Sequence, residues 1–116
     1  MHALTLPPAR RMRRRTEFQR VFDAGRRVHG RHLTVVFAPA RGPVSRLGIV
    51  ASRKLGGAVV RNRAKRLIRE AFRTSDSPSP ALDLVVIAKP SMVGVTAGEL
   101  GRDYQTTLTR LSLSRK

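Results

Sequence analysis

The sequence predicts a single α+β domain, an α/β sandwich in which helices pack on a small mixed sheet. Apolar residues follow a helical pattern, then an extended one, in the order helix, strands, helix, strand, helix. The chain has 116 residues, a length typical of one domain. It contains no cysteine, which excludes disulfides and thiolate metal sites. Its stability must therefore come from one modest hydrophobic core.

The first 15 residues predict a flexible basic arm. They contain Pro7-Pro8 and a cluster of arginines, without an apolar period. We therefore divide the chain into an arm over 1–15 and one RNA-binding domain over 16–116, and expect the arm to become ordered only against RNA.

A short first helix is expected next, because Thr16 and Gln19 have the spacing of a capping box. Gly25 is a typical helix stop. Apolar residues recur between them at helical spacing: Phe18, Val21 and Phe22.

Two strands are predicted over 32–38 and 46–52, where Val and Thr are enriched. Arg41-Gly42-Pro43 favours a turn between them, so we expect an antiparallel pair in which Phe37 points into the core. The apolar run 82–88 is typical of a buried strand, with a loop over 75–80 before it and Pro90 after it.

The most distinctive stretch, residues 55–73, combines a glycine turn with an amphipathic helix. One arc of that helix is apolar: Val60, Ala64, Leu67, Ile68, Ala71 and Phe72. The adjoining arc is basic or polar: Arg61, Asn62, Lys65, Arg66, Arg69 and Arg73. Thr96 and Glu99 form a second capping box and open a last helix. Its packing stripe is Leu100, Tyr104, Leu108 and Leu111.

The chain is strongly basic, with 24 Lys plus Arg against 7 Asp plus Glu and a formal net charge of +17. Such a charge indicates a polyanionic partner. No apolar run approaches the ~20 residues of a membrane-spanning helix, and the residues after the basic N-terminus lack the apolar core of a signal peptide. We therefore expect a cytoplasmic nucleic-acid-binding protein that does not bind membranes.

Arg61, Lys65 and Arg69 stand one turn apart, in a row that suits a phosphate backbone. The alternative is a solvated basic face with no ligand. Arg63 falls on the far shoulder of the helix, where it contacts a different RNA segment or points into solvent. Ser52-Arg53-Lys54 lead into the helix and suggest a phosphate cradle. The alternative there is an ordinary turn in which Gly56 supplies a positive φ.

The run Arg61-Asn62-Arg63 followed by residues 65–72 resembles the signature helix of the bacterial ribonuclease P protein component. The similarity extends to residues 46–54 and 83–88 and to Phe18 and Phe22. It implies an α-β-β-β-α-β-α order like the second domain of ribosomal protein S5. It also implies a left-handed βαβ crossover, although such crossovers are right-handed in ~98% of proteins.

The resemblance implies the protein subunit of a tRNA-processing endoribonuclease. Such a subunit binds a catalytic RNA and the 5′ leader of precursor tRNA, and the RNA performs Mg2+-dependent hydrolysis. Arg61, Asn62 and Arg63 would contact the catalytic RNA, and we add the neighbouring cations Lys65, Arg66, Arg69 and Arg73. The candidate leader-binding residues are Phe18, Phe22, Val36, Val50, Ser52, Arg53 and Lys54.

Two of these assignments have alternatives. Phenylalanines at i and i+4, such as Phe18 and Phe22, more often belong to a core than to a binding site. Val36 and Val50 replace residues that are often aromatic or hydroxyl-bearing in the family, which removes one stacking or hydrogen-bonding option.

The protein itself supplies no recognisable catalytic group. Its three histidines form no HExxH motif, and its seven acids are scattered singly. We therefore predict no catalytic or metal-binding residue, Mg2+ held mainly by the RNA subunit, and a monomer that binds this RNA 1:1. The alternatives are a structural RNA-binding protein of the ribosomal type, a protein-only ribonuclease, and a DNA-binding protein.

Overall fold

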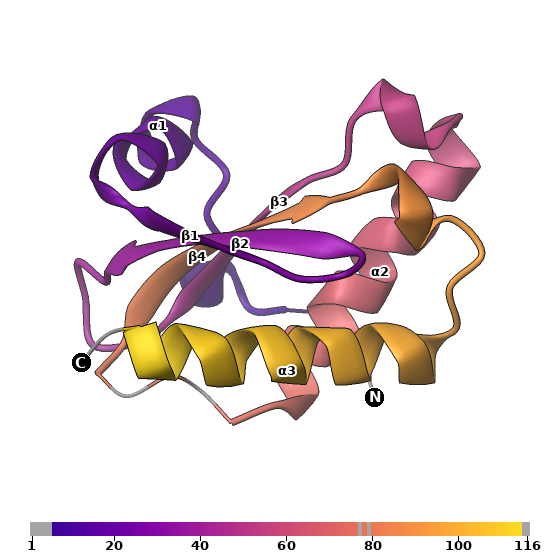
Figure 1. Ribbon diagram of the computed structural model, residues 1–116. Coiled ribbons are helices and arrows are strands. Elements are labelled where there is room, and N and C mark those ends of the chain that lie inside the picture. Colours follow the sequence, from indigo (N-terminus) through magenta and orange to yellow (C-terminus); the bar gives the residue numbers. More distant parts are fainter. Residues whose placement is uncertain (1–5, 77, 79, 115–116) are drawn as a thin grey trace.

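The computed structural model describes residues 6–76, 78 and 80–114. Within them a four-stranded sheet carries one helix on one face and two on the other (Figure 1). The helices and strands are α1 (Arg15–Ala24), β1 (Arg26–His29), β2 (Leu33–Pro39), β3 (Arg46–Val50), α2 (Ala58–Thr74), β4 (Leu82–Ala88) and α3 (Ala97–Ser114). Short 3-10 turns are η1 (Pro8–Arg10), η2 (Arg53–Leu55) and η3 (Pro90–Met92). This order, α-β-β-β-α-β-α, confirms the one implied by the resemblance.

The strands lie in the order β1-β2-β4-β3, with β3 parallel to β4 and the other pairs antiparallel. The predicted antiparallel pairing of 32–38 with 46–52 is therefore wrong, because β4 lies between those strands. The physical reason is burial: residues 82–86 are all buried, which requires a neighbouring strand on each side and helices on both faces.

The two faces of the sheet carry separate hydrophobic clusters. On one face α2 and α3 pack against inward residues of three strands, and the predicted stripe of α3 is buried there. Phe37 also points to this side, as predicted. On the other face α1 inserts Val21 against Val36 and Val85.

The N-terminal segment differs from the predicted flexible arm. Residues 6–14 follow the outer edge of β3, and Leu6 and Met12 are buried. The Met12 N–H donates to the Leu47 carbonyl oxygen at 2.9 Å, and Arg11 forms a parallel bridge with Leu47. The two apolar side chains fix this segment although they form no periodic pattern. Residues 1–5 of the predicted arm lie outside the described residues, as do Ser77 and Ser79 of the predicted 75–80 loop.

The ends of the helices test the capping predictions. The box expected at Thr16 and Gln19 is wrong: α1 begins at Arg15, and the Glu17 carboxylate accepts from the backbone N–H groups of Arg13 and Arg14, both at 3.4 Å. Gly25 follows the last residue of α1, as predicted.

The capping box of α3 is confirmed. The Thr96 N–H donates to Glu99 Oε1 at 3.0 Å, and the Glu99 N–H donates to Thr96 Oγ1 at 3.1 Å. The hydrogen bond from the Thr96 backbone lowers the pKa of Glu99.

A charged cluster joins α1 to the sheet. We call Glu17, Arg20, Arg46 and Asp83 the Asp83 cluster. The Asp83 side chain is fully buried and accepts from Arg46 Nε at 3.1 Å, from Arg46 Nη2 at 3.0 Å, and from Arg20. Arg46 also reaches Glu17 at 2.6 Å. A buried carboxylate requires such partners, so the cluster fixes α1 on β3 and β4.

We expect Asp83→Asn to destabilise the protein, because it leaves the largely buried Arg20 guanidinium without its counter-charge and leaves Arg46 with Glu17 alone. The loss in unfolding free energy should be about 3 kcal/mol. Urea denaturation measures it, with the exposed Asp76→Asn as the matched control. Equal stability of the two variants would contradict the role assigned to the Asp83 cluster.

The ion pair at Glu17 also predicts a pH dependence. The hydrogen bond from Arg46 lowers the pKa of Glu17 below its ordinary value. Glu17 therefore stabilises the fold above the unfolded pKa of about 4.3, and this contribution is lost as the pH falls through the lowered value. In thermal unfolding, Glu17→Gln should have a lower Tm than the parent at neutral pH. The difference should shrink under acid conditions, and a constant difference would contradict this explanation.

Candidate RNA-binding surface

Helix α2 presents the predicted basic arc. Its opposite side is held in the core by Ala64, Ile68, Ala71 and Phe72, all buried. That anchoring turns Asn62 and Arg66 outward to solvent and leaves Arg61, Lys65 and Arg69 half-buried. The predicted division of this helix into a packing face and a charged face is therefore confirmed.

The cations of α2 are only partly neutralised within the protein. Arg73 pairs with Glu70 at 2.8 Å on a one-third exposed surface. Among the described residues, no ion pair reaches Lys65, Arg66 or Arg69. The buried Nε of Arg61 also lacks a hydrogen-bond acceptor. A row of cations without protein counter-charges is suited to binding phosphate oxygens.

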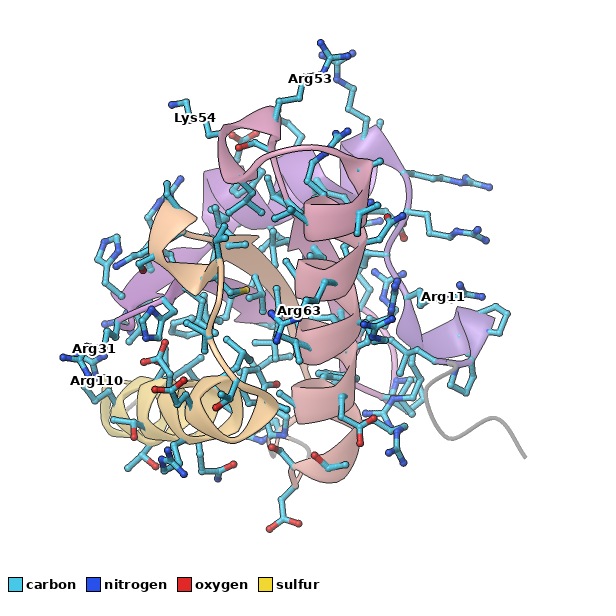
Figure 2. All side chains as sticks on the ribbon, turned by 90° about the vertical axis from the view of Figure 1, so that its right-hand side faces the viewer. Arg11, Arg31, Arg53, Lys54, Arg63 and Arg110 are labelled. Atoms are coloured by element: carbon cyan, nitrogen blue, oxygen red, sulfur yellow. The ribbon has the colours of Figure 1, made fainter. Side chains whose placement is uncertain are left out.

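Arg63 lies on the other flank of α2 (Figure 2). Its Nη2 donates to the Val95 carbonyl oxygen at 2.9 Å. There it lines a mainly apolar cavity of about 180 Å³ beside Met92 and Val93. The predicted far-shoulder position is thus confirmed, and Arg63 does not share the surface formed by Lys65 and Arg69.

Phe18 and Phe22 are both half-buried, so each combines a core contact with an accessible surface. Phe18 covers Gly48 of β3, where an added Cβ atom would lie only 2.7 Å from Cζ of the ring. The Arg27 guanidinium lies 5.7 Å from the ring centre of Phe22. Both aromatics therefore contribute to the core, and their role in ligand binding stays a prediction.

The prediction for Val36 is wrong. This side chain is fully buried beneath α1 and has no surface to offer a ligand. Val50 lies on the same side of the sheet and is half-buried, paired in register with Ile87 of β4. Ile87 is also half-buried. It was missed by the sequence analysis, although strand alternation from Asp83 and Val85 would place it on this face.

The turn between β3 and α2 carries exposed cations. Ser52 Oγ accepts from the Lys54 N–H at 3.3 Å and caps η2. Arg53 and Lys54 extend into solvent beyond the start of α2 (Figure 2). Gly56 has a φ of 137°, so the turn requires glycine there. The role of this turn as a phosphate cradle stays a prediction.

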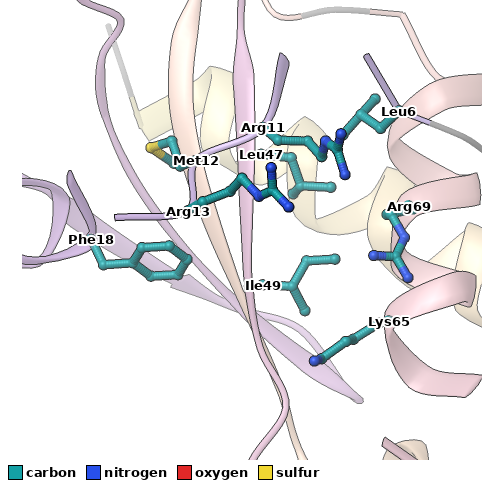
Figure 3. Close-up of a pocket in the computed structure, with 9 residues that line it drawn as sticks. All are labelled: Leu6, Arg11, Met12, Arg13, Phe18, Leu47, Ile49, Lys65 and Arg69. Atoms are coloured by element: carbon teal, nitrogen blue, oxygen red, sulfur yellow. The ribbon is translucent and has the colours of Figure 1, made fainter. Parts of the chain in front are cut away.

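A basic cleft of about 320 Å³ opens where the N-terminal segment, α1, β3 and α2 meet (Figure 3). Arg11 and Arg13 approach it from the N-terminal segment, and Lys65 and Arg69 from α2. We define the basic cleft by its nine lining residues: Leu6, Arg11, Met12, Arg13, Phe18, Leu47, Ile49, Lys65 and Arg69. It joins Phe18 to the cations of α2, which the sequence analysis assigned to two separate surfaces.

The described residues contain no group of three or more His, Cys, Asp or Glu side chains that could hold a metal ion. Asp83 and Glu17 are already engaged by arginines. The donor set of this part of the chain therefore does not fit a protein-held divalent metal. No described helix is both long enough and apolar enough to span a bilayer.

The fold and this basic surface define an RNA-binding α+β protein. Residues 6–112 match the family model described as Ribonuclease P. A ribonuclease P protein component from Beutenbergia cavernae is 44% identical over 114 residues, covering 96% of this chain and 95% of the relative. One from Desulfovibrio desulfuricans is 40% identical over 114 residues, covering 96% and 84%.

Solved structures agree with this match. The RNase P protein of Staphylococcus aureus superposes with a TM-score of 0.80 at 32% identity, covering 88% of this chain and 94% of that one. The RNase P protein of Thermotoga maritima gives 0.78 at 32% identity, covering 86% and 96%. The chain belongs to the ribonuclease P protein family, and its role is that of the protein subunit of this tRNA 5′-processing enzyme. The ribosomal-type alternative is not favoured.

We expect the double variant Arg61→Ala, Arg66→Ala to bind the RNase P RNA subunit more weakly and with a flatter salt dependence. Removing two phosphate contacts should reduce the slope of log K against log salt by about 2. Filter binding over a salt series measures this slope. The charge-matched control Arg31→Ala, Arg102→Ala alters exposed arginines away from α2. An unchanged affinity and slope in the α2 variant would contradict the assignment.

Proposed function

We propose that this subunit binds the catalytic RNA through α2 and the 5′ leader of precursor tRNA beside α1. The observation that carries this proposal is the basic cleft, in which the accessible Phe18 stands opposite Lys65 and Arg69. An aromatic ring next to cations is the arrangement that binds single-stranded RNA without sequence preference.

In this proposal the subunit neutralises the charge of the RNA phosphates and positions the precursor tRNA. With a net charge of +17, the protein reduces repulsion between catalytic RNA and substrate RNA, an effect that is strongest at low salt. Leader contacts favour precursor over product, since mature tRNA has no leader to occupy the surface. Val50, Ile87 and Ser52 extend this surface along the sheet face that α1 leaves accessible.

The hydrolytic step belongs, in this proposal, to Mg2+ bound mainly by the RNA subunit. What supports it is the protein's donor set, in which the buried acid Asp83 and its neighbour Glu17 are held by arginines. The protein acts in the cytoplasm as a monomer bound 1:1 to its RNA.

Single-turnover cleavage of a precursor tRNA at low Mg2+ tests the proposal. The reaction is run with the catalytic RNA alone, with RNA plus protein, and with protein alone. We expect the protein to accelerate cleavage only when the RNA is present. Absence of stimulation would reject the proposal, and cleavage by protein alone would move the chemistry into the protein.

Phe18→Ala should weaken binding of leader-bearing precursor and leave mature tRNA binding unchanged. Loss of one stacked base corresponds to ~1–3 kcal/mol, measured as precursor affinity of the holoenzyme. Phe18→Leu is the matched variant, because it keeps apolar contact with Gly48 but removes the aromatic face. A precursor affinity that is unchanged in Phe18→Ala would contradict the leader assignment, and full affinity in Phe18→Leu would exclude stacking.

A further inference from the structure

The basic cleft has the composition of a site for one nucleotide. Its cations come from two parts of the chain far apart in sequence, and its floor is apolar (Figure 3). We propose that it binds a single unstacked nucleotide of the bound RNA, with the base on Ile49 beside Phe18. The phosphate lies among Arg11, Arg13, Lys65 and Arg69. This inference rests on the proposed function as an RNA-binding subunit.

The size of the cleft sets the size of the ligand. Its volume of about 320 Å³ lies at the lower end of the roughly 300–1,000 Å³ typical of small-molecule sites. One base with its phosphate suits this space.

The charge of the cleft indicates a phosphate. Four of its lining side chains are cationic, and none of the described lining residues carries a carboxylate. The Nε of Arg11 is buried and has no hydrogen-bond acceptor. A buried unsatisfied N–H is costly, and a phosphate oxygen entering the cleft would supply the missing acceptor through a charge-assisted bond.

The apolar part of the cleft indicates a base in addition to an anion. Ile49 and Phe18 are both half-buried and keep accessible apolar surface, and Phe18 closes the side opposite α2. A free phosphate would leave this surface uncovered. A planar base would cover it without requiring hydrogen bonds from specific side chains, in keeping with binding that tolerates any sequence.

The site requires the N-terminal segment to be in place, since Arg11 and Arg13 form one of its walls. The hydrogen bond of 2.9 Å from the Met12 N–H to the Leu47 carbonyl oxygen holds that wall against the edge of β3. Arg11 and Arg13 are therefore further RNA-contacting residues, beyond those of α2.

Methyl NMR spectra of the full chain test the proposal with three probes: adenosine 5′-monophosphate, adenosine and inorganic phosphate. We expect the monophosphate to shift the Ile49 δ1 methyl at lower concentrations than either other probe. The Ile87 methyl, on the α1 side of the sheet, should not move. Arg11→Gln should raise the Kd of the monophosphate about tenfold, as expected for one charge-assisted hydrogen bond. Arg31→Gln, outside the cleft, should leave it unchanged.

Equal affinities for the monophosphate and inorganic phosphate would overturn the proposal and leave only a general anion site. A shift at Ile87 without one at Ile49 would also overturn it, placing the base on the sheet face formed by Val50 and Ile87. Stimulated cleavage without any Ile49 response would reject the nucleotide site and retain the proposed function. An Ile49 response without stimulated cleavage would support the site and reject the proposed function.

Discussion

The buried carboxylate of Asp83 is the constraint that orders the rest of the structure. It lies on β4, one of the two inner strands, and accepts from Arg46 of β3 and Arg20 of α1. Because Arg46 also binds Glu17, two residues of α1, Glu17 and Arg20, fix this helix to the sheet. That placement puts Phe18 over Gly48, where any side chain would displace the ring. A charge inside the sheet thus determines where this aromatic side chain lies on the protein surface.

Helix α2 divides its residues between two tasks that its neighbours enforce. The stripe that includes Ile68 and Phe72 fits the core, so the opposite arc must face outward with its charges. Arg63 departs from this arc, since the Val95 carbonyl oxygen holds it on the other flank. Within the sequence Arg61-Asn62-Arg63, the two arginines therefore lie on different sides of α2 and have different neighbours.

Much of the architecture was predictable from short-range pattern. The bounds of β4, the capping box of α3 and the two arcs of α2 each depend on residues close in sequence. The sheet order, the burial of Val36 and the capping of α1 by Glu17 were not predictable in this way, because tertiary contacts decide them. The basic cleft was missed for the same reason: Arg13 and Lys65 are distant in sequence, and Leu6 and Met12 gave no periodic signal for an ordered segment.

The pairing of Arg11 and Met12 with Leu47 also affects how the protein behaves when it is free of RNA. An open edge strand offers backbone N–H and C=O groups to other chains and is a common start of aggregation. Here the N-terminal segment covers the outer edge of β3, and the opposite edge strand, β1, has only 4 residues, two of them arginines. The N-terminal segment that brings Arg11 and Arg13 to the basic cleft thus also protects the edge of β3 against aggregation.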